Sequence, residues 1–257
     1  MEKEPLVSII TPLYNSEKFI AETIESVLTQ TYTNWEMLIV NDCSKDNGAS
    51  IVEEYSKKDK RIKLFNNEKN LGGAGTRNRA IKEAKGKYLA FLDSDDIWTP
   101  LKLEKQISFM EENDFSFTFT EYEKIDEESK SLNEKVIVPK RVTYKKLLKA
   151  NVIGCLTAIY NQEKLGKIYM PDVRKGQDFA LWLEVLKVSK EGYGLFEVLG
   201  KYRIRNNSLS QNKLDRIKCN YLIFRKYNNL NIIQSSWYVL NNVVEKILKL
   251  RVRKIKN

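Results

Sequence analysis

Tyr88-Leu-Ala-Phe-Leu-Asp-Ser-Asp-Asp-Ile-Trp98 carries the strongest structural signal in this chain. The apolar run Lys87–Leu92 predicts a buried strand, and it leads directly into Asp93, Asp95 and Asp96. Ligands of open α/β sheets bind beyond the carboxyl ends of the strands. Three carboxylates there repel one another unless a cation is present, and Mg²⁺ or Mn²⁺ suits ligands that are all oxygen. The sequence therefore predicts a divalent-cation site, and the alternative is a solvated acidic turn that caps the next helix.

The segments before this stretch alternate between strand and helix patterns. The predicted strands are Leu6–Ile10, Trp35–Val40 and Ile62–Phe65, and the predicted helices are Glu17–Gln30, 46–57 and Ala74–Ala84. Short connections between alternating elements predict a parallel sheet with helices on both faces. We expect a Rossmann-like nucleotide-binding half that ends near residue 95.

The strict alternation stops at the next predicted helix, Thr99–Asn113. Phe115–Tyr122 alternates aromatic and polar residues, which is typical of a half-buried strand, and residues 123–140 are charged and predict a loop or an exposed hairpin. The later predicted elements are a strand at Ala158–Tyr160, a helix at Asp178–Leu186 and a strand at Leu195–Ile204. The fold class is therefore α/β with a mixed central sheet, followed by a helical C-terminal extension.

The positive charge lies almost entirely in the C-terminal segment. The 257 residues carry a net charge of +10, but residues 201–257 hold 14 Lys and Arg against two acids, a net of +12. Residues 1–200 have a net charge of −2. A nearly neutral body argues against a nucleic-acid partner, because such proteins carry a basic face.

The last stretch, Trp237–Asn257, combines apolar residues at helical spacing with a basic end. That pattern is typical of a helix on an anionic membrane surface. The alternatives are a helix packed on the body and a helix that forms a homodimer. No apolar run is long enough to span a bilayer, and the N-terminus lacks the apolar core of a secretory signal. We expect a cytoplasmic protein, peripheral on the inner face of the cytoplasmic membrane.

The chain has no histidine. Mechanisms that need imidazole are therefore excluded, including Ser-His-Asp triads, His-ligated zinc and His general bases. The three cysteines, Cys43, Cys155 and Cys219, are far apart. They fit a reducing compartment and have no metal-binding spacing.

Other strand ends carry further candidate residues. Asp42 follows the second predicted strand, where a carboxylate can accept hydrogen bonds from a base or ribose, whereas Asp46 is expected to cap the following helix. Thr11–Asn15, after the first strand, is not glycine-rich, which argues against a dinucleotide fold. Leu71–Arg79 is glycine-rich but lacks the P-loop spacing. Its arginines are candidates to pair with a diphosphate or are surface charges of a helix.

Together these segments resemble family 2 of the glycosyltransferases, which have the GT-A fold. The resemblance covers roughly residues 6–210 and rests on five segments in order: Val7–Asn15, Val40–Asp46, Asn70–Asn78, Gly86–Asp96 and Lys175–Leu183. It implies a catalytic domain over 1–210, with a nucleotide-binding half (1–96) and an acceptor-side half (97–210), and a basic extension over 211–257.

The resemblance also implies roles for single residues. Asp93-Ser94-Asp95 matches the DXD motif, in which Asp95, with Asp93, binds Mn²⁺ or Mg²⁺ on the donor diphosphate. The residues that would border or hold the nucleotide are Thr11, Pro12, Tyr14, Asp42 and Arg77. Asp178 matches the catalytic base of the family.

The chemistry is consistent with one carboxylate base. A nucleoside diphosphate is already a good leaving group once a metal neutralises it, so no general acid is needed, unlike in two-carboxylate glycoside hydrolases. One base must take the proton of the acceptor hydroxyl as that hydroxyl attacks C1 from the opposite face, which inverts C1. The alternative role of Asp178 is to cap the helix through Trp182, and one residue can do both.

Two positions depart from the family pattern. Gln177 stands where relatives commonly have Glu, and Arg205 stands where many relatives have a histidine near the metal. Arginine does not ligate metals, so Arg205 or Arg203 is expected to clamp the diphosphate.

We therefore expect an inverting transferase that uses a UDP-type sugar and a saccharide acceptor, lipid-linked, in bacterial surface-polysaccharide synthesis. One alternative is a sugar-phosphate nucleotidyltransferase, which needs a glycine-rich basic first loop that Thr11–Asn15 does not provide. Another is a membrane- or nucleic-acid-binding module driven by the tail, whose binding would be salt-sensitive and independent of Asp95 and Asp178. A third is an inactive protein with the same fold.

Overall fold

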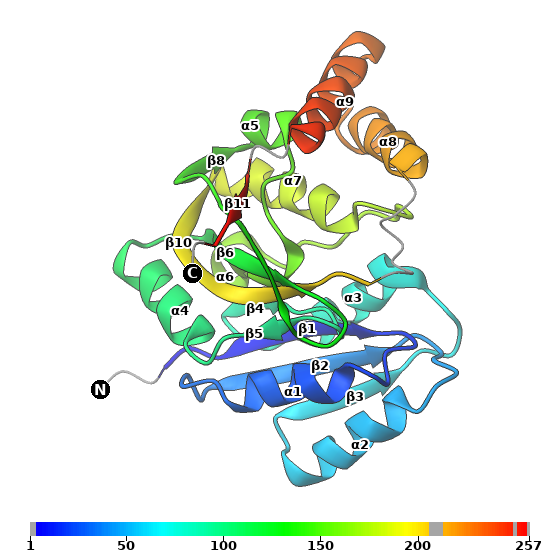
Figure 1. The fold of residues 1–257 in the computed structure, drawn as a ribbon, viewed down its shortest axis with the longest axis vertical. Coiled ribbons are helices and arrows are strands. Elements are labelled where there is room, and N and C mark those ends of the chain that lie inside the picture. Colours follow the sequence, from blue (N-terminus) through cyan, green and yellow to red (C-terminus); the bar gives the residue numbers. More distant parts are fainter. Residues whose placement is uncertain (1–3, 206–212, 249–250, 256–257) are drawn as a thin grey trace.

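A single mixed β-sheet runs through the chain (Figure 1). The computed structural model describes residues 4–205, 213–248 and 251–255. Four parallel strands form one part of the sheet: β1 (Val7–Leu13), β2 (Trp35–Asn41), β3 (Ile62–Asn66) and β4 (Tyr88–Phe91). They occur in the order β4-β1-β2-β3, as expected for a Rossmann-like half.

The second part of the sheet continues directly from β4. β9 (Ile159–Asn161) lies antiparallel between β4 and β6 (Phe117–Ile125). The sheet then continues through β7 (Ser131–Val136) to β11 (Val252–Lys254). The long strand β10 (Glu191–Arg203) runs parallel to β6 and pairs with two short strands, β5 (Ile97–Trp98) and β8 (Arg141–Thr143). The two predicted halves therefore share one sheet, and the mixed α/β fold is confirmed.

Helices cover both faces of the sheet, because the central strands are apolar on both faces. In β2, Met37 and Ile39 belong to one buried cluster, and Leu38 and Val40 belong to the other. The first cluster is covered by α1 (Ile20–Leu28), α2 (Gly48–Lys58) and α4 (Lys102–Glu112). The second is covered by α3 (Gly72–Glu83), α5 (Tyr144–Lys149) and α7 (Gln177–Ser189). Short helical turns at Cys155–Thr157 and Gln162–Leu165 flank β9.

Two segments differ from their predicted boundaries. The glycine-rich segment from Gly72 is itself the first turn of α3, so that helix begins before Ala74. For residues 123–140 the expected alternatives were a loop and an exposed hairpin, and the structure has the hairpin. The strand β6 extends to Ile125 and pairs with β7.

The C-terminal extension packs on the body of the protein. It contains α8 (Lys213–Leu222), a π-helical turn (Ile223–Tyr227) and α9 (Ile232–Ile247). Asn242 Nδ2 donates to the carbonyl of Leu148 in α5 at 2.8 Å. No helix in the described part of the chain is long and apolar enough to span a bilayer. The predicted domain boundary at residue 210 lies outside the described residues.

The expectation that the helical pattern continues from Trp237 toward residue 257 is wrong. The helix ends at Ile247, and Val252–Lys254 form β11 against β7. The carbonyl of Arg251 accepts from the amide of Ile137 at 2.9 Å. The edge of β7 offers unpaired backbone groups, and pairing them is more favourable than another helical turn of charged residues.

Candidate active site

The turn after β4 brings the predicted metal-binding carboxylates to the carboxyl end of the parallel strands. The amide of Asp96 donates to the carbonyl of Asp93 at 3.1 Å, which closes a turn over residues 93–96, called the carboxylate turn below. Ser94 is buried, and its Oγ lies 3.0 Å from Oγ of Ser16, in the loop that follows β1. The turn is thus fastened to the first strand's loop, as expected for a site at the strand ends.

Both predicted metal ligands form ion pairs with arginines. Nη2 of Arg77 pairs with Oδ1 of Asp93, and Nη1 of Arg205 lies 3.0 Å from Oδ2 of Asp95. Burial raises the pKa of Asp95, and the negative charge of Asp93 raises it further. Two carboxylates that repel each other in this way suit a divalent cation. Among the described residues, no group of three or more His, Cys, Asp and Glu side chains could hold a metal. A metal here therefore needs additional oxygens from the donor diphosphate and water.

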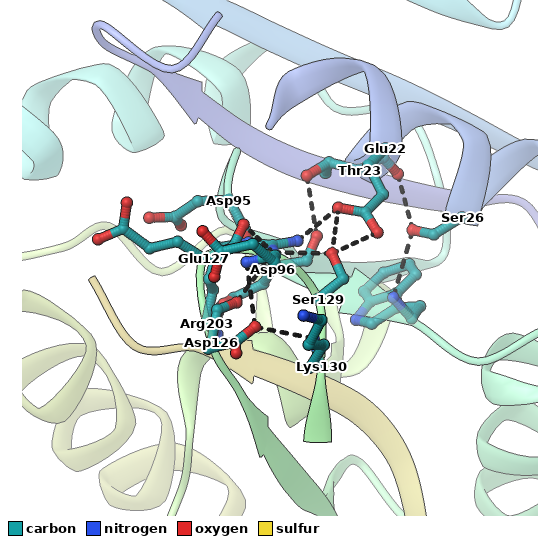
Figure 2. Close-up of polar contacts among 12 residues, drawn as sticks. Glu22, Thr23, Ser26, Asp95, Asp96, Asp126, Glu127, Ser129, Lys130 and Arg203 are labelled. Carbon is teal, nitrogen blue, oxygen red and sulfur yellow. Dashed lines mark hydrogen bonds and ion pairs between the residues drawn. The ribbon is translucent and has the colours of Figure 1, made fainter. Parts of the chain in front are cut away.

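Arg203 anchors this turn instead of facing an open site (Figure 2). Its side chain is 1% exposed, and its Nε donates to the carbonyl of Asp95 at 2.8 Å. Its Nη2 pairs with Glu22 in α1 at 2.6 Å, and its Nη1 donates to Oγ of Ser129 at 2.8 Å in the β6–β7 loop. The expectation that Arg203 clamps a diphosphate is therefore corrected, because protein atoms occupy its guanidinium. The side chain of Arg205 is partly exposed, and a contact of Arg205 with a diphosphate stays a prediction.

Asp42 fastens the start of α3 to the end of β2. Its carboxylate accepts from the amides of Leu71 at 2.8 Å and Gly72 at 2.9 Å, and from Nδ2 of Asn67 at 2.8 Å. A carboxylate at a helix N-terminus satisfies amides that have no partner within the helix. Gly72 has φ of +70°, which favours glycine at this junction. The nucleoside contact expected of Asp42 stays a prediction.

The other residues expected at the nucleotide lie at the end of β1. Thr11 is buried, and its Oγ1 has no hydrogen-bond partner within the described residues. Pro12 follows it in β1, and Tyr14 is exposed in the next loop. An unpaired buried hydroxyl beside a site is unusual, since such groups normally find partners. These positions lie at or just after the carboxyl end of β1, the strand next to β4, and their contacts with a ligand stay predictions.

Asp178 lies in the first turn of α7, after Gly176, whose φ is +75°. Burial raises the pKa of Asp178, and the negative charge of Asp93 raises it further. A hydrogen bond from the amide of Phe179 and the positive charges of Arg216 and Arg77 lower it in part. The expected base therefore lies within electrostatic range of the carboxylate turn.

The start of α7 also meets the start of α3. Gly73, in the first turn of α3, lies against the side chain of Gln177 at the start of α7. A Cβ atom on Gly73 would lie only 3.3 Å from Oε1 of Gln177 and 3.0 Å from Nη1 of Arg77, so a larger residue would crowd both side chains. The tertiary structure thus brings together Asp93, Arg77 and Asp178, which come from three separate segments of the sequence.

Two residues of this site were not found by sequence reasoning. Burial raises the pKa of the Cys155 thiol, and Asp93 and Asp178 add to the rise, so Cys155 lies among the site carboxylates. Its isolated position in the sequence gives no signal. The positive charge of Arg216 in α8 lowers the pKa of Asp178. The only sign of this residue in the sequence was the basic charge of the C-terminal segment.

The profile of glycosyl transferase family 2 matches residues 8–230. The chain belongs to glycosyltransferase family 2. This membership confirms the predicted family and the prediction of a glycosyltransferase over the nucleotidyltransferase and the binding module. The match extends past residue 210 and includes α8, the helix that carries Arg216.

Two relatives of this family 2 enzyme span nearly its whole length. A Bacillus subtilis glycosyltransferase assigned to teichuronic acid biosynthesis, TuaG, is 43% identical over 91% of this chain and 93% of its own. The Escherichia coli enzyme WfgD, named UDP-Glc:alpha-D-GlcNAc-diphosphoundecaprenol beta-1,3-glucosyltransferase, is 43% identical over 95% of this chain and 94% of its own.

Solved structures confirm the GT-A fold of this family 2 enzyme. Staphylococcus aureus TarS, solved in complex with UDP-GlcNAc, has a TM-score of 0.72 at 23% identity, over 91% of this chain and 70% of the TarS chain. A Pyrobaculum calidifontis mannosyltransferase, solved with GDP-Man and Mn²⁺, has a TM-score of 0.71 at 16% identity, over 93% of this chain and 70% of its own.

Proposed function

We propose that this family 2 enzyme transfers a sugar, with inversion, from a UDP-sugar to a hydroxyl of a lipid-linked saccharide in bacterial surface-polysaccharide synthesis. The name of WfgD specifies a UDP-sugar donor and a diphosphoundecaprenol acceptor, and TuaG is assigned to a surface polymer. Donors such as UDP-glucose are α-linked, so the β product in the name of WfgD requires inversion.

One observation carries the proposal: the partly buried carboxylate of Asp178 lies within electrostatic range of the carboxylate turn and its arginine. An inverting transferase needs one base on the acceptor side and a cationic environment for the diphosphate on the donor side. Asp178 supplies the first. Arg77 and Arg205, together with a divalent cation held by the carboxylates they pair with, would supply the second.

The proposed step is a direct displacement. Asp178 accepts the proton of the acceptor hydroxyl as the hydroxyl oxygen forms its bond to C1 of the donor sugar. The bond between C1 and the diphosphate oxygen breaks, and the electron pair leaves with UDP. Burial favours this role, because a raised pKa makes Asp178 a stronger base than an exposed aspartate.

The proposed metal is Mn²⁺ or Mg²⁺, held by Asp95 and Asp93 together with donor oxygens. When bound, it neutralises the charge that develops on the leaving diphosphate. Arg77 and Arg205 pair with the two carboxylates and orient them for this role.

The C-terminal extension is proposed to lie on the membrane that holds the acceptor. One side of α9 is apolar and exposed, with Ile233 81% and Ile247 72% exposed to solvent. Exposed Lys218 and Lys226 lie on the neighbouring α8 and π-helical turn and would attract an anionic surface. The protein would then be peripheral on the cytoplasmic face, with homodimerisation through the same side of α9 as the competing arrangement.

Transfer of labelled sugar from a panel of UDP-sugars to a GlcNAc-diphosphate lipid, with and without Mn²⁺, tests the proposal. Wild type should form a β-linked product from one UDP-sugar, and Asp95→Ala and Asp178→Asn should abolish most of the transfer. Asp114→Asn is the matched control, since Asp114 is an exposed aspartate far from the site in the fold. Retention at C1, or full activity of Asp178→Asn, would refute the mechanism.

A further inference from the structure

The segment that leads into α7, and so to Asp178, has no regular structure of its own. Residues 166–176 form no helix or strand, and Asp178 lies in the first turn of the helix that follows. Asn78 of α3 holds this segment at one point, because its side chain makes two hydrogen bonds with the backbone of Met170, at 2.7 and 2.9 Å. The position of Asp178 therefore depends on what holds residues 171–176.

The π-helical turn of the C-terminal extension holds this backbone at two further points. The hydroxyl of Tyr227 donates to the carbonyl of Asp172 at 2.8 Å. The side chain of Ile223 packs against Gly176, where a Cβ atom would lie 3.4 Å from Cδ1 of Ile223. Both contacts are made to backbone immediately before α7, so the extension supports the start of that helix directly.

A row of three aromatic rings joins the first turn of α7 to α9. The ring of Phe179, the residue after Asp178, meets the ring of Phe224 edge-on, with centroids 5.8 Å apart. The ring of Phe224 also contacts that of Tyr238 in α9, again with centroids 5.8 Å apart. Phe224 and Phe179 are fully buried. Aromatic pairs prefer specific relative orientations, so Phe224 restricts how the first turn of α7 can lie.

The π-helical turn is itself firmly held, as an element that positions another must be. The carbonyl of Ile223 accepts from the amide of Asn228 at 3.1 Å and from Nδ2 of the same residue at 2.9 Å. The hydroxyl of Tyr144 in α5 donates to Oδ1 of Asn228 at 2.8 Å. Helical turns of this wide type are rare and occur often at functional sites. Here the turn supplies Ile223, Phe224 and Tyr227 together to the start of α7.

We propose that the C-terminal extension positions the base of the reaction, with Phe224 and Tyr227 as positioning residues that act through the start of α7. The inference rests on the proposed function for the role of Asp178. A base must lie within hydrogen-bond reach of the proton that it accepts, and a small displacement of a reacting group costs much of the rate. The extension then serves the chemical step as well as the proposed contact with the membrane, and Tyr238 of α9 connects the two.

Hydrogen exchange and transfer kinetics of the full chain test this role together. Phe224→Leu keeps the position apolar but removes the ring, so the amides of residues 172–179 should exchange faster. The kcat for sugar transfer should fall about 10²-fold, the loss typical of a displacement of about 1 Å. The calorimetric affinity for UDP with Mn²⁺ should stay unchanged. Phe119→Leu is the matched control, because Phe119 is equally buried and packs against Gly194 of β10. It should lower the thermal stability similarly and leave kcat unchanged.

Tyr227→Phe is the second variant, because it removes one hydroxyl and leaves the core intact if Phe224→Leu does not fold. It should speed the exchange of residues 172–176 and lower kcat by about two- to tenfold, the equivalent of one hydrogen bond. Tyr55→Phe is its control, since the hydroxyl of Tyr55 donates to Glu25 at 2.7 Å on the other face of the sheet. The control should change neither kcat nor the exchange of residues 172–176.

A positioning role also predicts that the losses disappear once the base is absent. In Asp178→Asn, a further Phe224→Leu or Tyr227→Phe change should not lower the residual kcat, because residues that act as a unit have non-additive effects. Losses that add in that background, or unchanged exchange of residues 172–179 in both variants, would overturn the inference. A wild type that transfers no sugar would refute the proposed function as well, whereas an active wild type with unaffected variants would refute this inference alone.

Discussion

Nη1 of Arg205 lies 3.0 Å from Oδ2 of Asp95, so a guanidinium occupies the immediate surroundings of the expected metal ligand. Arginine at this position changes the local charge without supplying a metal ligand. A cation that approaches Asp95 must displace or reorient Arg205. The pair is therefore expected to limit how strongly the proposed metal binds in the absence of the donor.

Arg205→Ala is expected to tighten the binding of Mn²⁺ alone by about 1.4- to fivefold, because a partly exposed ion pair contributes about 0.2–1 kcal/mol. Electron paramagnetic resonance of free Mn²⁺ measures this affinity directly. The same variant should bind UDP more weakly in the presence of Mn²⁺, since a diphosphate clamp is lost. Arg141→Ala, which breaks an exposed pair with Glu191, is the control. Unchanged Mn²⁺ affinity in Arg205→Ala would contradict this reasoning.

Asp178 is expected to determine the acidic side of the pH–rate profile. Burial raises its pKa, so kcat/KM should fall tenfold per pH unit below a value that lies above the usual 3.9 or so of an aspartate. Asp178→Asn should lower kcat by about 10²–10⁴-fold while the affinity for UDP stays unchanged. Initial rates from pH 4 to 9 and calorimetry with UDP make the comparison. An acidic limb that survives unchanged in the variant would assign the titration to another group.

Arg203 is expected to stabilise the fold. Its buried guanidinium joins the carboxylate turn, α1 and the β6–β7 loop (Figure 2). Arg203→Met should lower the free energy of unfolding by about 2–4 kcal/mol, because charged hydrogen bonds are lost and Glu22 and several carbonyls lose a donor. Thermal or urea unfolding measures the loss. Arg141→Met at the surface should change stability by less than about 0.5 kcal/mol. Similar stability of the two variants would mean that Arg203 is free for another role.

Lys102 is expected to make stability depend on pH at the alkaline end. Its side chain is fully buried, Nζ donates to Oε1 of Gln106, and burial lowers its pKa well below the usual value. The unfolded chain then binds a proton that the folded chain does not, so stability rises with pH up to about 10.4, by at most about 1.36 kcal/mol per pH unit.

Lys102→Met should therefore be more stable than wild type near pH 7, and the difference should shrink as pH approaches 10. Urea unfolding of both proteins at several pH values tests this dependence. Lys105→Met is the control, because Lys105 is partly exposed on the same helix. A difference that does not change with pH would show that the amine is charged in the folded state.

Much of the fold was predictable because its signals are local. The apolar runs that become β1, β2 and β4 and the acidic turn after β4 are contiguous in the sequence, so their positions follow from patterning and strand polarity alone. The boundaries of β10 and the strand β11 were not predictable in this way. β11 exists because it pairs with β7, more than one hundred residues earlier in the chain, and local propensity does not encode that partner.

Local sequence patterns alone identified the family, the alternating strands and helices of the first half and the candidate carboxylates, because each of these rests on short contiguous segments. Only the tertiary structure decided which arginines serve those carboxylates. It encloses the guanidinium of Arg203 and leaves that of Arg205 partly exposed, although the two residues are neighbours in the sequence. It also brought Arg216 to Asp178 through the packing of α8 on α7. The physical reason is that burial and charge depend on distances through space, which a linear pattern does not contain.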